Sequence, residues 1–270
     1  MRFLLVISCA ALSLTGLAAS ERQLSYTHDS NVLAPGQKEI EVWGTFRSGR
    51  DYYYRRVDNR IELEYGVAEH LQTAVYLNFR SVNSDPSGTG TVETDQVNGI
   101  SWEWKWKLAD AVADPVGAAL YLEGTASGHE LEAELKGIID KRFGDELIAL
   151  NLTVEPEWEN ERKKHPEVKL EATLGWSHIV AKGFAVGLEL RNTHLIERET
   201  SSGGDEEWKH LTNVFHGGPS VHIAQNGFWA TITVMPQLFA VQSASGNEKK
   251  NRERQEAEDL EVRALIGFSF

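Results

Sequence analysis

The sequence predicts an all-β protein, an antiparallel up-and-down transmembrane β-barrel of about twelve strands. Three observations predict this fold class: apolar and polar residues alternate with a period of two, short and long connections take turns between the alternating stretches, and the last residue is the aromatic Phe270. Because successive side chains of a β-strand point to opposite faces, a two-residue period gives each strand one apolar and one polar face.

Residues 1–20, "MRFLLVISCAALSLTGLAAS", have the pattern of a secretory signal peptide. A basic residue near the start, an apolar middle and small residues at the end place the expected cleavage just before Glu21. Cys9 is the one cysteine of the sequence and lies in this segment, so we expect the mature chain to hold no disulfide, thiolate-bound metal or cysteine nucleophile. Residues 21–36 are expected to form either a disordered lead-in or a plug.

The charge of the chain excludes several classes of partner. Its formal net charge is −13, and loss of Arg2 with the signal peptide makes the mature chain one unit more negative. Such an excess of acid argues against binding to nucleic acid or to an anionic membrane surface. After the signal peptide, no apolar run approaches the ~18 residues of a membrane-spanning helix, which excludes an α-helical membrane protein. We expect no cofactor and no metal site.

The predicted barrel occupies residues 37–270, and most of its strands place aliphatic or aromatic residues at every second position. In order, the first six are KEIEVWGTFR (38–47), VDNRIELEYGV (57–67), LQTAVYLNFRSV (71–82), ISWEWKWKL (100–108), VGAALYLEG (116–124) and ELEAELKGIIDKRF (130–143). The last six are ELIALNLTVEPEW (146–158), EVKLEATLGW (167–176), FAVGLELRNTH (184–194), WKHLTNVFHGGPSVHI (208–223), FWATITVMPQL (228–238) and LEVRALIGFSF (260–270).

The connections between these strands take turns in length. The short ones are expected at 68–70, 144–145, 177–183 and 224–227, with 109–115 a little longer. The long, polar ones are expected at 83–92, 159–166, 195–207 and 241–257, with 49–55 and 125–129 as shorter members of that set. Strict alternation means that the two ends of the hairpins face different environments, as in outer-membrane barrels.

Aromatic residues on the apolar parity gather beside the short connections. They form a predicted girdle at the membrane interface: Tyr65, Phe143, Trp176, Phe184 and Phe228, with Phe268 and Phe270 at the end of the chain. A soluble sandwich or lipocalin-like barrel would show the same period. Two features favour the membrane barrel. The twelve strands have the length of ~9–11 residues that a tilted membrane-spanning strand needs, and aromatic residues lie at the strand ends.

In a membrane barrel the polar parity faces the lumen. The lumen-lining candidates are Arg60, Glu62, Glu64, Glu103, Lys105, Lys107, Glu132, Glu134, Lys136, Lys169, Glu171, Glu189, Arg191, Glu261 and Arg263. Acids and bases alternate along and between strands, so these side chains either brace a wet lumen by cross-strand ion pairs or form a charged channel for small solutes. Twelve strands lie between the eight of filled barrels and the ~16–18 of open porins, which predicts a narrow or plugged path.

One stretch, FHGGPSVH at 215–222, suggests hydrolytic chemistry. His216, Ser220 and His222 share one parity, but residues two apart on a strand lie ~7 Å apart. A nucleophile and its base need a hydrogen bond, and the sequence has no G-x-S-x-G motif. A local kink or bulge at residues 217–219 is the better interpretation, and we expect no catalytic residues.

The terminal aromatic after alternating apolar residues, Phe268 and Phe270, resembles the signal by which bacterial outer-membrane proteins reach the barrel-assembly machinery. The stretches EYGVAEHLQTAVYLNF and WEWKWKLADAVADPVGAALYLEG resemble little-characterised proteobacterial outer-membrane β-barrels, similar in pattern to the transporter-like barrels of phenol-degradation (meta-pathway) clusters. The resemblance implies outer-membrane lipid as surroundings, a Gram-negative outer membrane as location, and a channel or passive transporter for an unidentified small solute. A structural or surface-binding barrel and an outer-membrane lipid hydrolase are the alternatives.

Overall fold

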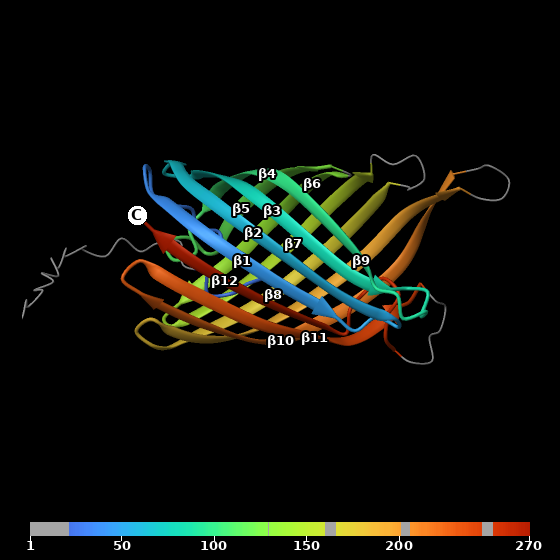
Figure 1. The fold of residues 1–270 in the computed structure, drawn as a ribbon. Helices are drawn as coiled ribbons and strands as arrows, with labels where there is room; N and C mark the ends of the chain where they lie inside the picture. Colours follow the sequence, from blue (N-terminus) through green and yellow to red (C-terminus); the bar gives the residue numbers. More distant parts are fainter. Residues whose placement is uncertain (1–21, 129, 160–165, 201–205, 245–250) are drawn as a thin grey trace, which may run out of the picture.

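The computed structural model describes residues 22–128, 130–159, 166–200, 206–244 and 251–270. These residues form twelve antiparallel strands in one closed barrel, in which strands adjacent in sequence pair and β1 pairs with β12 (Figure 1). The strands are β1 (Lys38–Ser48), β2 (Tyr53–Ala68), β3 (Leu71–Asp85), β4 (Glu93–Ala109), β5 (Gly117–Ser127), β6 (Glu130–Phe143), β7 (Glu146–Glu159), β8 (Glu167–Ala181), β9 (Phe184–Thr200), β10 (Glu206–Gln225), β11 (Phe228–Gln242) and β12 (Leu260–Ser269). The predicted fold class and strand number are confirmed. The predicted signal peptide, 1–20, lies outside the described residues.

Closure of the barrel depends on its first and last strands. β1 and β12 pair from Glu39 with Ser269 to Ser48 with Leu260, and Lys38 and Phe270 exchange backbone hydrogen bonds of 3.3 and 2.9 Å beside them. These bonds use the N–H and C=O groups that would otherwise line two open sheet edges. The amphipathic stretch at the end of the chain is therefore the strand that closes the barrel.

The two faces of the barrel wall have opposite chemistry. Along β1, Ile40 and Val42 are 40% and 47% exposed on the outside, whereas Glu39 and Glu41 beside them are fully buried on the inside. A barrel that folds in water would place these two sets the other way round. The wall therefore has an apolar outer face and a polar inner face, the arrangement found in outer-membrane barrels. Among the described residues, no helix is long and apolar enough to cross a membrane.

Some strands are longer than the side-chain alternation predicted. β9 continues to Thr200 and β10 begins at Glu206, so most of the connection expected at 195–207 is a two-stranded ribbon that projects beyond the barrel (Figure 1). Backbone pairing continues there although both faces of the ribbon carry polar side chains, because the ladder of N–H and C=O groups does not depend on an apolar face. The alternation of apolar and polar residues ends where the outer face of the strands no longer contacts a nonpolar environment.

The predicted strict alternation of connection lengths is wrong at two places. β5 ends at Ser127 and β6 begins at Glu130, which leaves a tight connection where a longer one was expected. The connection from Ala109 to Gly117, expected to be short, is longer than that one. We call the end of the barrel where β1 begins and β12 ends the turn end, and the opposite end the loop end.

We call residues 22–36 the inner segment, and the part from 22 to 33 lies inside the barrel. Leu24, Tyr26 and Leu33 are between 1% and 4% exposed, although the inward face that surrounds them is largely polar. Small residues on the strands make room for the segment: at Gly187 on β9, a Cβ would lie 3.1 Å from Leu24 Cδ2. The strands and the inner segment are therefore fitted to each other.

Candidate functional site

The charged residues that the sequence assigned to the lumen divide into four groups. Those that line one large cavity are Arg60, Glu132, Glu134, Lys136, Lys169, Glu171, Arg191, Glu261 and Arg263. A second, buried group near the turn end comprises Glu62, Glu64, Glu103 and Lys105. Glu189 binds the inner segment. Lys107 instead bonds to Asp110 in the β4–β5 connection, with an Nζ–Oδ2 distance of 2.6 Å.

The cavity, which we call the outer cavity, has a volume of about 510 Å³. It extends from Tyr26 and His28 of the inner segment to Arg50 and Glu256 in connections at the loop end. Its wall is the inward face of the strands, and its floor is the inner segment. A space of this size is in the range that holds a small-molecule ligand.

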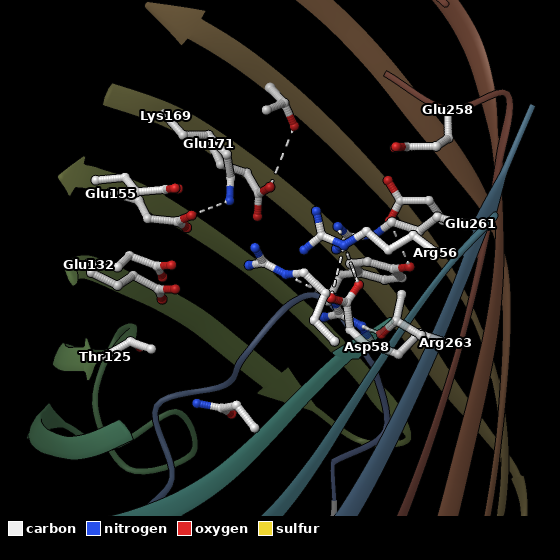
Figure 2. A pocket seen from close by; sticks show the side chains of 18 of the residues that line it. Arg56, Asp58, Thr125, Glu132, Glu155, Lys169, Glu171, Glu258, Glu261 and Arg263 are labelled. Atoms are coloured by element: carbon white, nitrogen blue, oxygen red, sulfur yellow. Dashed lines mark hydrogen bonds and ion pairs between the residues drawn. The ribbon is translucent and has the colours of Figure 1, made fainter. Parts of the chain in front are cut away.

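Arginines dominate one side of the outer cavity. Asp58 on β2 is shared by three of them: Arg56 Nε at 2.9 Å, Arg80 Nε at 3.5 Å and Arg47 Nη1 at 3.6 Å. Figure 2 shows Arg56 and Arg263 gathered around Asp58 and Glu261. Arg80 also pairs with Glu130 at 3.1 Å, and Arg47 with Glu261. With Arg191 and Arg263, five arginines on this side outnumber these three acids, which leaves an excess of positive charge.

A second cluster continues this side across β9 and β12. Glu261 pairs with Arg191 and also lies 3.4 Å from Arg47 Nε. Arg263 stacks over the Tyr26 ring at 3.9 Å and donates to Thr45 Oγ1 and to the carbonyl of Ser25. Its contacts thus tie the inner segment to the arginine side of the cavity.

Carboxylates dominate the opposite side, on β6, β7 and β8. Lys169 Nζ lies 2.5 Å from Glu155 and Lys136 Nζ lies 2.7 Å from Glu134, and Glu132 adds a further acid to the lining. Figure 2 shows Glu132, Glu155 and Lys169 across the cavity from the arginine cluster. The cavity therefore presents positive charge on one side and negative charge on the other.

Glu189 holds the middle of the inner segment. Its carboxylate accepts hydrogen bonds from the backbone N–H groups of Ser25 at 2.9 Å, Tyr26 at 2.8 Å and Thr27 at 2.8 Å. Thr233 Oγ1 on β11 donates to the same carboxylate at 2.8 Å. Bonds to an ionised acceptor are stronger than neutral ones, so one buried side chain fixes three successive residues of the segment.

Other strands hold the segment from different directions. Asn151 on β7 exchanges two hydrogen bonds with the backbone of His28, at 2.7 and 2.8 Å. Gln72 on β3 accepts from Leu33 N at 2.9 Å. Arg22 Nη1 lies 3.7 Å from Glu41 on β1 and its guanidinium is over the Trp43 ring. Strands on opposite sides of the barrel thus contact one short stretch of chain.

The residues of the suspected hydrolytic stretch bind other groups. Ser220 Oγ donates to the carbonyl of Gln23 at 3.3 Å, His216 Nε2 lies 2.9 Å from the carbonyl of Glu258, and His222 Nδ1 lies 2.8 Å from Thr231 Oγ1. Ser220 therefore serves the inner segment. The predicted irregularity is present in part: β10 pairs with β9 throughout this stretch, while its register with β11 shifts just before His216.

The aromatic residues predicted as a girdle are exposed on the outside near the turn end. They are Tyr65, Phe143, Trp176, Phe184, Phe228, Phe268 and Phe270, with exposed fractions from 37% to 62%. A second set of exposed aromatics, not predicted from the sequence, lies toward the loop end and includes Trp158, Trp208 and Phe239. The two sets border the apolar belt on both sides.

Sequence reasoning missed several inward charges. Glu39 and Glu41 lie between the apolar residues of β1, and Arg56 and Asp58 continue the inward parity of β2. Extending each strand's polar parity over its full length would have found them. Tyr26, which forms part of the cavity floor, gave no signal, because nothing in residues 21–36 shows periodicity.

Comparisons with known proteins give a family and a fold. The model of a family of unknown function, DUF6662, matches residues 17–270. The COG4313 outer membrane channel from Pseudomonas putida F1 has a TM-score of 0.61 and 12% identity over 90% of this chain and 98% of that chain. The beta domain of the Bordetella autotransporter BrkA has a TM-score of 0.50 and 11% identity over 87% of this chain and 100% of that chain. A search of curated proteins finds no sequence match.

Proposed function

The chain belongs to the DUF6662 family, whose function is unknown, and we propose that it is a channel of a Gram-negative outer membrane, closed at rest by its inner segment. The observation that carries the proposal is the combination of an apolar outer wall, a charged interior and a segment that crosses this interior. The charged cavity of about 510 Å³ is large enough to hold a small polar solute. A closable path for a small polar solute accounts for all three features.

Location in an outer membrane is supported by the exterior of the barrel. Leu152 and Ile100, for example, are 58% and 60% exposed, which costs free energy in water and is favourable in lipid. Aromatic residues border this belt toward both ends, where they would meet the lipid headgroups. On this proposal the turn end faces the periplasm, and Phe268 and Phe270 on the closing strand are read by the barrel-assembly machinery.

The inner segment acts as the plug in this proposal. Its backbone is held by Glu189, Asn151 and Gln72, which belong to β9, β7 and β3. Hydrogen bonds to surrounding side chains, rather than continuous strand pairing, hold it, so it can leave without breaking the barrel ladder. With a plug of this kind, the path can open while the strand pairing that stabilises the barrel stays intact.

The solute class follows from the lining of the outer cavity. Arg47, Arg56 and Arg80 lie on one side, and Glu132 and Glu155 lie on the other. Opposite fields on the two sides orient a solute that carries both an anionic and a cationic group and disfavour neutral apolar compounds. We therefore propose small zwitterionic or otherwise charged hydrophilic solutes as the cargo.

Planar-bilayer conductance tests the proposal. We expect the mature wild-type protein to be closed for most of the time and a variant that lacks residues 22–34 to show frequent or continuous conductance steps. A variant that lacks the exposed connection residues 87–90 serves as a matched deletion control and should behave as the wild type does. If all three fold into membranes and none conducts, a structural or surface-binding barrel is the better description.

Uptake into liposomes tests the solute class. Vesicles that contain the deletion variant should take up a zwitterionic solute faster than a neutral aromatic solute of equal size. Faster uptake of the neutral aromatic compound would contradict the assignment from the cavity lining. Phospholipase activity that disappears in Ser220→Ala would replace the channel by the hydrolase alternative.

A further inference from the structure

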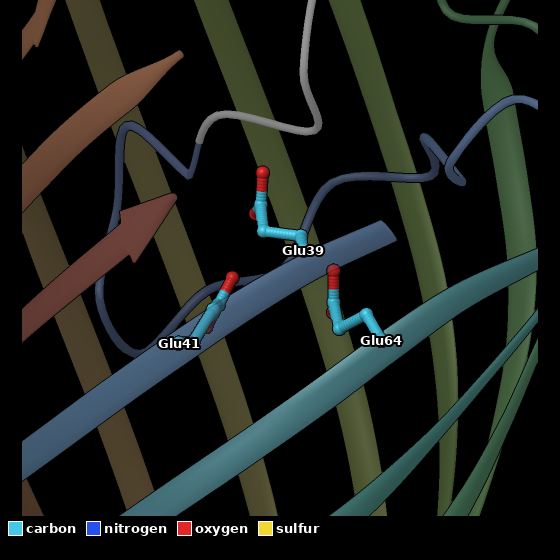
Figure 3. Close-up of side chains that lie close together, drawn as sticks. All are labelled: Glu39, Glu41 and Glu64. Atoms are coloured by element: carbon cyan, nitrogen blue, oxygen red, sulfur yellow. The ribbon is translucent and has the colours of Figure 1, made fainter. Parts of the chain in front are cut away.

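Five buried glutamates gather on the inward faces of β1, β2 and β4 near the turn end, outside the outer cavity. We call this group the glutamate cluster: Glu39, Glu41, Glu62, Glu64 and Glu103, with exposed fractions of 6% or less. One carboxylate oxygen each of Glu39, Glu41 and Glu64 lie within 4.8 Å of one another, and the same holds for Glu62, Glu64 and Glu103. Figure 3 shows Glu39, Glu41 and Glu64 projecting from two adjacent strands toward the lumen.

The strand register places like charges face to face. Glu39 is directly opposite Glu64, and Glu41 is directly opposite Glu62. Like charges at directly opposed positions destabilise a sheet, and burial increases the cost. Arg22, 3.7 Å from Glu41, and Lys105, which interacts electrostatically with Glu41, Glu64 and Glu103, supply fewer positive charges than the cluster has carboxylates.

Three carboxylate oxygens of the cluster have no hydrogen-bond partner among the described residues. They are Glu41 Oε1, Glu62 Oε2 and Glu64 Oε2, and all three are buried. Buried polar atoms are almost always hydrogen-bonded in proteins, so each exception needs a reason. Three such oxygens in one cluster, on side chains at least nine-tenths buried, point to a bound positive ion.

The remaining oxygens of these side chains are held in place. Trp43 Nε1 donates to Glu41 Oε2 at 2.8 Å, and Gln72 Nε2 donates to Glu64 Oε1 at 2.8 Å. Carboxylates that bind metal ions are commonly oriented in this way, with one oxygen anchored by a hydrogen bond and the other on the ion. These two bonds fix the orientation of the Glu41 and Glu64 side chains within the cluster.

We propose that the glutamate cluster is a divalent cation site that takes Ca²⁺, with Glu64, the residue shared by the two groups of three, as its central ligand. An all-oxygen set suits hard cations such as Ca²⁺, Mg²⁺ and Mn²⁺. Ca²⁺ takes about six to eight oxygen ligands in a flexible geometry, whereas Mg²⁺ usually keeps several waters and binds through one or two carboxylates. Five buried carboxylates in one cluster therefore fit Ca²⁺ better.

The bound ion would act as a strut at the turn end. It links β1 and β2, next to the seam where β1 meets β12, and it neutralises carboxylates close to Arg22 at the start of the inner segment. The inference does not rest on transport, since a sealed barrel would need the same charge compensation. Its tests therefore measure ion binding and stability rather than conductance.

The test uses the folded mature protein in detergent, first stripped with EDTA. Isothermal titration with CaCl₂ should show about one ion bound per chain, and Ca²⁺ should raise the apparent melting temperature by several degrees. The variant Glu62→Gln/Glu64→Gln should lose measurable Ca²⁺ binding and the Ca²⁺-dependent shift. In EDTA this variant should melt above the wild type, because it removes opposed like charges.

The matched control is Glu157→Gln/Glu171→Gln, which makes the same charge change in the outer cavity and should leave Ca²⁺ binding unchanged. If the stripped wild type folds but binds neither Ca²⁺ nor Mg²⁺ nor Mn²⁺, the proposal is wrong and protonation of the glutamates compensates the cluster. Tighter binding of Mg²⁺ than of Ca²⁺ would overturn the choice of ion. Loss of binding in the control but not in the cluster variant would move the site to the outer cavity.

Discussion

The substitution Glu189→Gln tests how the inner segment is held. The carboxylate of Glu189 accepts three backbone hydrogen bonds, from Ser25, Tyr26 and Thr27, at 2.8 to 2.9 Å. Glutamine has almost the same size but offers one acceptor oxygen and one N–H₂ donor. At least one backbone N–H of the inner segment then faces another donor, while the barrel wall keeps its shape.

The expected effect can be worked out from these bonds. Loss of one hydrogen bond to a charged acceptor costs about 1.5–3 kcal/mol. The bonds that remain change from charge-assisted to neutral and lose roughly half of their strength. The two effects together should weaken the binding of the inner segment to the barrel by about 3 kcal/mol. The equilibrium constant for local release of the segment then rises about 100-fold.

Hydrogen–deuterium exchange followed by mass spectrometry measures this release directly. Amides that exchange through local opening do so in proportion to the opening equilibrium. Peptides covering residues 22–36 should therefore exchange about 100-fold faster in Glu189→Gln than in the wild type, while peptides from the strands stay unchanged. Channel openings should become more frequent in the same variant.

The control is Glu157→Gln, which removes one carboxylate from the outer cavity without removing a bond to the inner segment. It should leave the exchange of residues 22–36 as in the wild type. Equal exchange rates in Glu189→Gln and the wild type would show that this carboxylate does not hold the segment. Faster exchange throughout the barrel would show that Glu189 supports the wall instead.

Three further predictions concern the wall and its assembly. Gly66→Ala would place a Cβ in overlap with backbone carbonyl oxygens of the inner segment, one of them at 2.7 Å, and should lower the free energy of unfolding in urea by about 1–3 kcal/mol. In the control Gly137→Ala, the new Cβ meets nothing within 4 Å, and the free energy of unfolding should stay within about 0.5 kcal/mol of the wild type. Equal effects of the two substitutions would argue against the close fit of the inner segment. Leu152→Arg, on the outside of β7, should lower the stability in lipid by about 2–4 kcal/mol, whereas Thr125→Arg, at the outer cavity, should fold almost normally. Refolding into liposomes measures both effects. If the protein tolerates both substitutions, the outer face does not contact lipid. Deletion of Phe270 should slow barrel assembly in cells, measured by the appearance of the heat-modifiable folded form, and normal assembly would show that the terminal aromatic is not a signal.

Much of the fold was readable from side-chain alternation. In β6 the alternation began and ended where the strand does, at Glu130 and Phe143. One face of this strand contacts nonpolar surroundings and the other the polar interior, so the pattern follows the strand from end to end. In β9 and β10 the alternation ended before the strands did, at Thr200 and Glu206. There polar side chains occupy both faces of the ribbon, and the strands stay paired through their backbones and through contacts such as the ion pair of Arg198 with Glu206 at 3.0 Å.

The candidate site was readable only in part. The inward parity identified Glu62, Glu64 and Glu189, but gave them equivalent roles as lumen charges. The structure separates them, since Glu189 binds backbone N–H groups of the inner segment and the other two lie face to face with acids of β1. A two-residue period reports which face a side chain occupies and carries no information on its partner across the barrel.

The strands, their inward and outward faces and the amphipathic last strand are encoded locally, because they depend on the two-residue period and on which solvent meets each face. The tertiary structure alone decided the register, the opposition of arginines to carboxylates in the outer cavity, and the path of residues 22–36 through the interior. These features depend on distances between strands remote in sequence, such as β3, β7 and β9, which closure of the barrel fixes and no local pattern encodes.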